Sequence, residues 1–198
     1  MLTLFHAPGT RSTSMVQLLL ELGAADQVQI ELVTIPRRDG SGGADAKNPH
    51  PEKKVPFLTD GHDSVRERSA ITLYLTDRFP ARNLGRAVGD PQRGEYLSWL
   101  FWYQGVLEPL AMLRFAGLDH PVLKDTYRDY DTAIAKLDDV LRAQPYLLGD
   151  DFSAADLVIS GLFAWMGDHA GTTDAIKAWI TRCTDRDSYR RVTISAAA

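Results

Sequence analysis

The chain is poor in the residues that build covalent or metal-held scaffolds. Its 198 residues include a single cysteine, Cys183, so no intrachain disulfide, CxxC redox pair or cysteine-rich metal site can form. The five histidines are scattered and show no HExxH or similar spacing. We therefore expect no metal site, and we expect any reactive thiol to arrive with a substrate.

Long apolar runs and an excess of positive charge are lacking as well. No apolar run approaches the ~20 residues that a membrane-spanning helix needs, and the first residues show no apolar core of a signal peptide. The net charge of −4 gives no reason to expect a nucleic acid or an anionic membrane as partner. These absences predict a cytoplasmic protein without a nucleic-acid or membrane partner.

The first 80 residues alternate between strand and helix patterns. Short apolar or alternating runs predict the strands, and one helical pattern ends at Gly23, a residue typical of the position after a helix. A stretch rich in glycine and proline, residues 36–51, predicts a long loop. The predicted strands are 2–6, 28–33, 55–59 and 64–67, and the predicted helices are 13–22 and one that ends at Phe79.

Beyond Pro80 the strand signals nearly vanish, which predicts an all-helical second domain. Residues 81–89 have the composition of a linker, so we expect a first domain over 1–80 and a second over 90–198. The predicted helices of the second domain are 91–116, 124–143, one that starts at Ser153, 173–183 and 187–194.

Two features of the second half predict local helix structure. Ser153 and Asp156 have the spacing of a capping box, with Phe152 placed as a hydrophobic staple. Pro109 is a candidate kink within the helix predicted over 91–116. These signals are structural and say nothing of catalysis.

Two segments of the first half are suited to hold a ligand. Pro56 cannot donate a hydrogen bond to a sheet, so Val55-Pro56 is expected at an edge or bend where the main chain of Val55 pairs with a guest backbone. Glu67, Arg68 and Ser69 come just before an apolar helical pattern, and a helix start stabilises a bound carboxylate. Together the segments indicate a peptide-like ligand with a carboxylate.

Three motifs in this order resemble those of the glutathione transferase family: NPHPEKKVPFL over 48–58, ERSAITLYLTDRFP over 67–80 and FSAADL over 152–157. The resemblance covers essentially the whole chain. It implies an α/β, thioredoxin-like N-terminal domain that binds glutathione and an all-α C-terminal domain that shapes the second-substrate pocket. It also implies a homodimer that serves in detoxification.

The resemblance assigns roles at the glutathione backbone. Val55 would pair with the cysteinyl part of glutathione, and Pro56 would be the cis proline that gives this geometry. Lys54 would neutralise the glycyl carboxylate, with Lys53 as the fallback.

The γ-glutamyl end of glutathione would be held at the helix start. Glu67 matches the family's acidic residue, whereas Arg68 stands where the family usually has serine. Arginine can bind a carboxylate through two hydrogen bonds, but it cannot cap a helix as serine does. Ser69 is the alternative for the serine's role.

The activating group is expected in the turn over 7–14, APGTRSTS, which is rich in hydroxyls. It resembles the beta-class pattern SPGACS, with Arg11 in the place of the cysteine and Ser12 in that of the following serine. A mixed disulfide of the beta type is thereby excluded at Arg11. Ser12 is the expected hydroxyl, with Thr10 and Arg11 as supporting or rival groups, and a plain helix N-cap is the alternative role for Ser12.

The pocket for the second substrate, a small hydrophobic electrophile, is expected along the helix predicted over 91–116. Spacing alone does not identify the lining face, and Tyr103, Gln104 and Glu108 are the candidates. The main prediction is a transferase that conjugates glutathione to this electrophile. The alternatives are another glutathione-dependent enzyme, such as a peroxidase, dehalogenase or isomerase, or a non-catalytic glutathione-binding protein.

Overall fold

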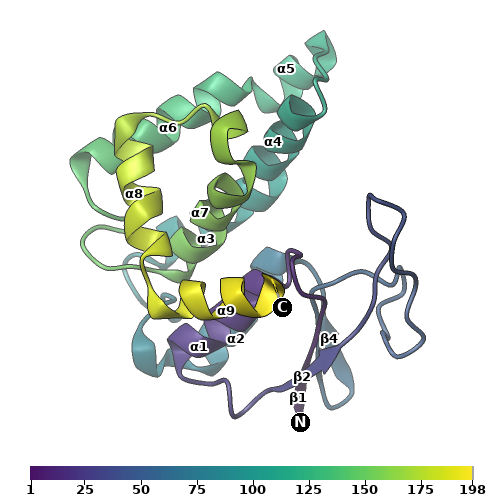
Figure 1. The fold of residues 1–198 in the computed structure, drawn as a ribbon. Helices are drawn as coiled ribbons and strands as arrows, with labels where there is room; N and C mark the ends of the chain where they lie inside the picture. Colours follow the sequence, from purple (N-terminus) through teal and green to yellow (C-terminus); the bar gives the residue numbers. More distant parts are fainter. Residues whose placement is uncertain (198) are drawn as a thin grey trace. The chain divides into compact units, whose positions relative to one another are not determined.

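A computed structural model describes residues 1–197 of the chain (Figure 1). By internal contacts the chain divides into two compact units. The first unit joins Met1–Leu84 with the segment from Asp187 onward, and the second is Gly85–Arg186. No helix among the described residues is long and apolar enough to cross a membrane.

The first unit is built on a mixed sheet of four strands in the order β2-β1-β3-β4. β1 runs parallel to β2 and antiparallel to β3, and β3 pairs antiparallel with β4. Leu4 of β1 pairs in register with Leu58 of β3, and both side chains are fully buried. The expected thioredoxin-like sheet is confirmed. The strands are β1 (Leu2–His6), β2 (Gln29–Leu32), β3 (Phe57–Asp60) and β4 (Asp63–Val65).

The helices of the first unit come from both ends of the chain. The last helix packs on the first, since Gln17 donates to Ser188 Oγ at 3.3 Å and Ser188 donates to Glu21 at 2.5 Å. The sequence-based boundaries placed this segment in the helical domain over 90–198, whereas its contacts group it with the first unit. The helices are α1 (Thr13–Leu22), α2 (Arg68–Arg78), the short η1 (Pro80–Arg82) and α9 (Asp187–Ala197).

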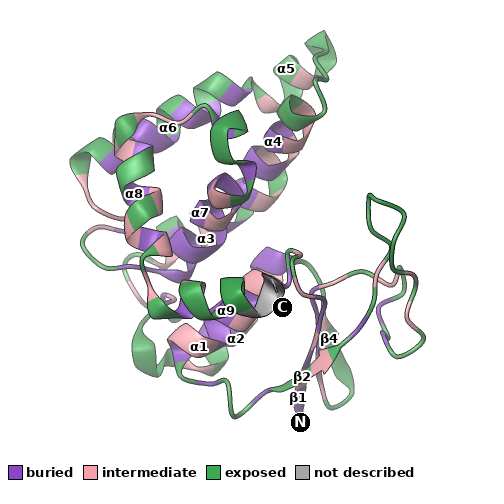
Figure 2. Cartoon of the chain, viewed as in Figure 1, coloured by how far each residue is buried: buried purple, intermediate pink, exposed green. Residues whose placement is uncertain are grey.

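The second unit is helical, as expected. Figure 2 shows that one of its helices, α7, is buried along nearly its whole length, so the other helices pack around it. The helices are α3 (Arg93–Trp102), the π-helical η2 (Tyr103–Leu107), α4 (Glu108–Phe115), α5 (Pro121–Tyr127), α6 (Tyr130–Ala143), α7 (Ala154–Met166), the short η3 (Gly167–Ala170) and α8 (Asp174–Thr184).

The helix predicted over 91–116 is continuous but contains a π-helical turn. The N–H of Glu108 donates to the carbonyl of Tyr103, five residues back, where an α-helix would use the fourth. Pro109 follows directly and has no N–H to donate. The irregular turn therefore lies just before Pro109, the residue predicted from the sequence as a candidate kink.

The single helix predicted over 124–143 is wrong, because the chain breaks between α5 and α6. Arg128 has a φ of 68°, which is outside the helical region. Asp129 then caps α6, as its carboxylate accepts the N–H of Thr132 at 2.7 Å. The helical periodicity of the sequence continues across this break, so the periodicity did not reveal Asp129 as a helix cap.

Asp156 connects three parts of the second unit. It forms the predicted capping box with Ser153, which donates its N–H at 2.9 Å and its hydroxyl at 2.6 Å. The other carboxylate oxygen accepts the N–H of Leu147 and the indole N–H of Trp179, both at 2.9 Å. The buried start of α7 is thereby fixed to α8 and to the preceding loop.

Replacing Asp156 with asparagine tests this connection. In either orientation the amide NH2 would face at least one N–H group that can only donate, so we expect Asp156→Asn to lower the free energy of unfolding by about 2–3 kcal/mol. Urea denaturation measures the loss. Asp139→Asn, at an exposed position of α6, is the matched control and should stay within about 0.5 kcal/mol of the wild type. Equal stability of all three proteins would contradict this role of Asp156.

Candidate functional site

The sheet register brings the two ligand-binding segments of the first unit together. Phe5 of β1 pairs with Phe57 of β3 in antiparallel register. The turn that follows His6 therefore lies beside the Val55-Pro56 step that precedes Phe57. The candidate site lies at this end of the sheet.

Ser12 is the centre of the turn between β1 and α1, and its side chain points inward. The residue is fully buried. Its Oγ accepts the N–H of Ala7 at 3.1 Å and lies 2.7 Å from Nδ1 of His6. It stands at the N-cap position of α1, but its side chain makes no capping bond, so the interpretation of Ser12 as a plain helix cap is wrong.

Thr10 carries the hydroxyl that is both in this network and partly exposed. Its Oγ1 lies 2.8 Å from Ser12 Oγ and donates to the carbonyl of Ala7 at 2.8 Å. The N–H of Ser12 donates to the same oxygen at 3.2 Å. Arg11, the third candidate of the turn, is exposed. Of the two residues whose hydroxyls form this network, Ser12 is buried and Thr10 is partly exposed.

The Val55–Pro56 peptide is cis. No hydrogen bond among the described residues uses the N–H or the C=O of Val55. Val55 is half-buried and Pro56 is buried. The main chain of Val55 is therefore able to pair with an extended ligand.

The loop before Val55 is held by Asn48, a residue that the sequence interpretation missed. Asn48 is fully buried and donates its side-chain N–H to the carbonyl of Lys54 at 3.0 Å. Lys53, with a φ of 54°, donates its ammonium to the carbonyl of Asn48 at 2.6 Å. The ammonium of Lys54 is exposed and lies 3.0 Å from Glu52, so Lys54 is the lysine that extends into solvent. The sequence signals for Asn48 are its position next to a proline and its place as the first residue of the motif over 48–58.

The three candidate ligand-binding residues at the start of α2 differ in their burial. Glu67 is exposed and adopts φ 69° and ψ 128°, a backbone conformation that costs about 1–3 kcal/mol. Arg68 and Ser69 are buried. Thr72 lies between this turn and α1, since its hydroxyl donates to the carbonyl of Arg68 at 2.8 Å and its oxygen lies 3.7 Å from Met15 Sδ. Strained backbone of this kind clusters at binding sites.

The three candidates for the second-substrate pocket lie at the π-helical turn of the second unit. Tyr103 and Glu108 are buried, and Gln104 is partly exposed. Their role in a pocket stays a prediction. Within residues 1–197, no group of three or more His, Cys, Asp or Glu side chains could hold a metal ion.

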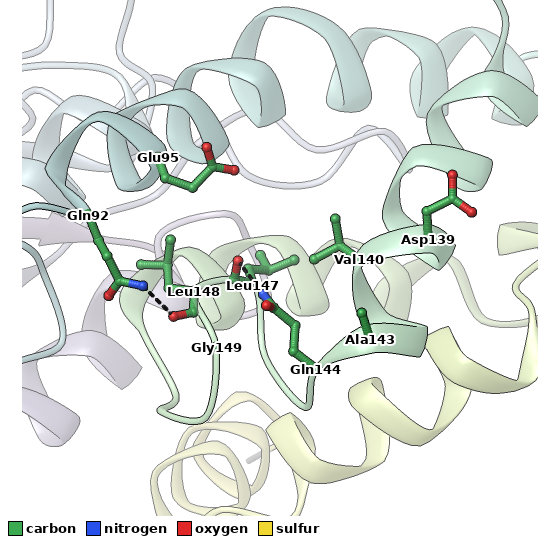
Figure 3. Close-up of a pocket in the computed structure, with 9 residues that line it drawn as sticks. All are labelled: Gln92, Glu95, Asp139, Val140, Ala143, Gln144, Leu147, Leu148 and Gly149. Atoms are coloured by element: carbon green, nitrogen blue, oxygen red, sulfur yellow. Dashed lines mark hydrogen bonds between the residues drawn. The ribbon is translucent and has the colours of Figure 1, made fainter.

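A cavity of about 500 Å³ in the second unit contains none of these three residues (Figure 3). Glu95 and Asp139 are its two acidic lining residues, and Figure 3 shows the carboxylate of Asp139 pointing away from the other residues that line the cavity. The side-chain amide of Gln92 has a structural role, since it donates to the carbonyl of Leu148 at 2.8 Å. The lining residues are Gln92, Glu95, Asp139, Val140, Ala143, Gln144, Leu147, Leu148 and Gly149.

Known proteins resemble this chain in sequence. The family model described as "Glutathione S-transferase, N-terminal domain" matches residues 4–83. An "Uncharacterized GST-like protein" of Streptococcus mutans is 28% identical over 92% of this chain and 76% of its own length. The "Disulfide-bond oxidoreductase YghU" of Escherichia coli is 26% identical over 92% of this chain and 69% of its own.

Solved structures share the fold along the whole chain. The bacterial transferase BphK in a ternary complex has a TM-score of 0.78 at 23% identity, with 99% of this chain and 100% of that chain covered. A sphingomonad glutathione S-transferase complexed with glutathione has a TM-score of 0.78 at 24% identity, with 98% of each chain covered. The fold class is thus that of the glutathione S-transferases. With the family model and the similar sequences, it supports membership of this chain in the glutathione S-transferase family.

The burial of Ser12 leads to a stability prediction. Ser12→Ala leaves the N–H of Ala7 and the Nδ1 of His6 without their buried partner, so we expect the free energy of unfolding to fall by about 1–3 kcal/mol. Ser14→Ala removes only a bond in an exposed position, from Ser14 Oγ to the carbonyl of Arg11, and serves as the control with a smaller loss. Urea denaturation distinguishes them. A Ser12→Ala variant as stable as the control would show that the hydroxyl is not a structural group.

Proposed function

We propose that the chain is a glutathione transferase that activates the thiol of glutathione for attack on a small hydrophobic electrophile. One observation carries this proposal: the sheet register places the unpaired main chain of Val55 beside the turn that presents the Thr10 hydroxyl. A peptide-like ligand paired with Val55 would have its thiol near this hydroxyl. Arg11 takes the place of the cysteine that forms a mixed disulfide with glutathione in the beta class. Without that cysteine, activation of the thiol by a hydrogen bond is favoured.

The main chain of glutathione would pair with the N–H and C=O of Val55, beside the cis peptide to Pro56. Lys54 would neutralise the glycyl carboxylate, because its ammonium reaches solvent while that of Lys53 is used within the loop. Its exposed ion pair with Glu52 contributes little and is easily exchanged for a ligand carboxylate. Asn48 would act indirectly, by holding the backbone of Lys54.

The γ-glutamyl end would lie at the start of α2. Glu67 is exposed, and its carboxylate would pair with the ligand's ammonium group. The backbone N–H groups at the helix start would bind the ligand's carboxylate, since the helix dipole favours negative charge there. Arg68 and Ser69 are buried. We therefore propose that they contact the γ-glutamyl end through the backbone of this first turn of the helix.

Thiol activation needs a modest free energy, which a hydroxyl can supply. A thiol with a pKa of about 8.5 is only a few per cent ionised at pH 7, and lowering this pKa by two units takes about 2.7 kcal/mol. A hydrogen bond to a thiolate contributes about 1.5–3 kcal/mol, and a helix start adds about 0.3–1 kcal/mol. We propose the Thr10 hydroxyl as this donor. Ser12 was the first choice from sequence, but its burial favours Thr10.

The thiolate would then attack an electrophilic carbon held close to it, so that proximity and activation together produce the rate enhancement. Tyr103, Gln104 and Glu108 stay the candidates that line the pocket for this electrophile. Action as a cytoplasmic homodimer, typical of the family, belongs to the same proposal.

A disulfide-exchange activity is the second candidate function. It is favoured by the similarity to the disulfide-bond oxidoreductase of Escherichia coli, which covers 92% of this chain. In such a reaction the thiolate of one glutathione attacks a disulfide, and the displaced thiolate leaves. The same Thr10 hydroxyl would stabilise the attacking thiolate, so the two reactions differ only in the acceptor.

The role of Thr10 predicts a specific shift. Thr10→Val keeps the side-chain shape but removes the hydroxyl, so the pKa of the bound glutathione thiol should rise by about 1–2 units while affinity changes little. Thr10→Ser keeps the hydroxyl and should stay within about half a unit of the wild type. The ultraviolet absorbance of the bound thiolate, titrated with pH, measures both variants. An unchanged pKa in Thr10→Val would move the activating role to Arg11 or Ser12.

The activity itself is tested by binding followed by turnover. We expect the purified protein to be retained on glutathione-agarose, to be eluted by free glutathione, and to conjugate glutathione to a generic aryl halide. Reduction of a small mixed disulfide, measured in parallel, should be the slower reaction. Retention with disulfide reduction alone would support the second candidate, and retention without either reaction would indicate a binding protein. Failure to bind glutathione would overturn the proposed function.

A further inference from the structure

His6, the last residue of β1, is buried and faces the turn that follows it. Its Nδ1 atom lies 2.7 Å from the Oγ of Ser12, which lies 2.8 Å from the Oγ1 of Thr10. Burial lowers the pKa of His6 to about 4, so at pH 7 the ring is neutral and only one of its nitrogens carries a hydrogen. The choice of nitrogen decides where the two hydroxyl hydrogens point.

The backbone around the hydroxyls restricts this choice. The N–H of Ala7 donates to Ser12 Oγ at 3.1 Å, and the N–H of Ser12 donates to Thr10 Oγ1 at 3.2 Å. The carbonyl oxygen of Ala7 lies 2.8 Å from Thr10 Oγ1 and can only accept. The hydrogen between these two oxygens must therefore belong to Thr10.

The hydroxyl of Ser12 also lies 3.2 Å from the Ala7 carbonyl oxygen, so four contacts share at most three hydrogens. The three hydrogens fill the three shorter contacts, and the 3.2 Å contact is the one left without its own hydrogen. With the Thr10 hydrogen on the Ala7 carbonyl, the 2.8 Å contact between the hydroxyls needs the hydrogen of Ser12. Ser12 has no second hydrogen, so the 2.7 Å contact with His6 must be filled by a hydrogen on Nδ1. With the hydrogen on Nε2, only the two hydroxyl hydrogens remain for these three short contacts, so at least one pair of atoms would lie 2.7–2.8 Å apart with no hydrogen between them. Buried polar groups rarely stay unpaired in this way.

We propose that His6 is a positioning residue that keeps its hydrogen on Nδ1 and acts through Ser12 to make the Thr10 hydroxyl a donor to the ligand thiolate. The inference rests on the proposed function. In this relay each group donates to the next, and the hydrogen of Thr10 moves from the Ala7 carbonyl to the thiolate when the ligand binds. Each bond polarises the next and strengthens it by roughly 10–30%.

Two substitutions of His6 separate a relay from a merely structural role. His6→Asn retains an amide N–H near the place of Nδ1, whereas His6→Leu fills the space without a donor. We expect His6→Leu to raise the pKa of bound glutathione by about half a unit, with its Kd within about twofold, and His6→Asn to restore the wild-type pKa. An unchanged pKa in His6→Leu, or the same shift in both variants, would overturn the relay.

The tautomer of the His6 ring can be measured directly, in the absence of glutathione, and the measurement does not depend on the activity of any variant. Nitrogen-15 NMR of the wild-type histidine rings at pH 7 distinguishes a hydrogen on Nδ1 from one on Nε2, and His6 is identified as the signal lost in His6→Asn. A hydrogen on Nδ1 is expected, and a hydrogen on Nε2 overturns the relay even if glutathione is activated normally. Loss of glutathione binding in the wild type would instead overturn the proposed function, so the two failures are distinct.

Discussion

The candidate site depends on one buried hydroxyl, that of Ser12. It accepts the N–H of Ala7 and bridges His6 and Thr10, so these buried polar groups of the turn between β1 and α1 are paired in this conformation. A buried group without its partner would cost about 1–3 kcal/mol. The bonds that stabilise the turn are the same bonds that orient Thr10. Under the proposal, one network therefore sets both the stability of the turn and the direction in which the Thr10 hydroxyl donates.

The sheet register supplies the other half of the site. Because β1 and β3 pair through Phe5 and Phe57, the oriented hydroxyl of Thr10 lies at the end of the sheet where the main chain of Val55 is unpaired. Asn48 holds the loop that delivers Val55, through the carbonyl of Lys54. The proposed site would thus combine backbone pairing, which orients a peptide-like ligand, with a single donor at the reacting atom.

Local signals made much of the fold predictable and little of the site's internal geometry. The helix over 13–22 has the predicted bounds because its apolar spacing ends at Gly23, which adopts the left-handed conformation. The break at Asp129 was missed because an aspartate inside a helical period looks like an exposed side chain until its cap is seen. The inward direction of Ser12 and its pairing with His6 depend on how strand and turn pack, which spacing along the chain does not contain.

A crystal structure of the protein with glutathione bound tests the central claim most directly. The account predicts the ligand sulfur within hydrogen-bonding distance of Thr10 Oγ1, the ligand main chain paired with Val55, and Ser12 still turned inward toward His6. A sulfur held by Arg11, or by a Ser12 hydroxyl rotated out of its buried network, would contradict the account.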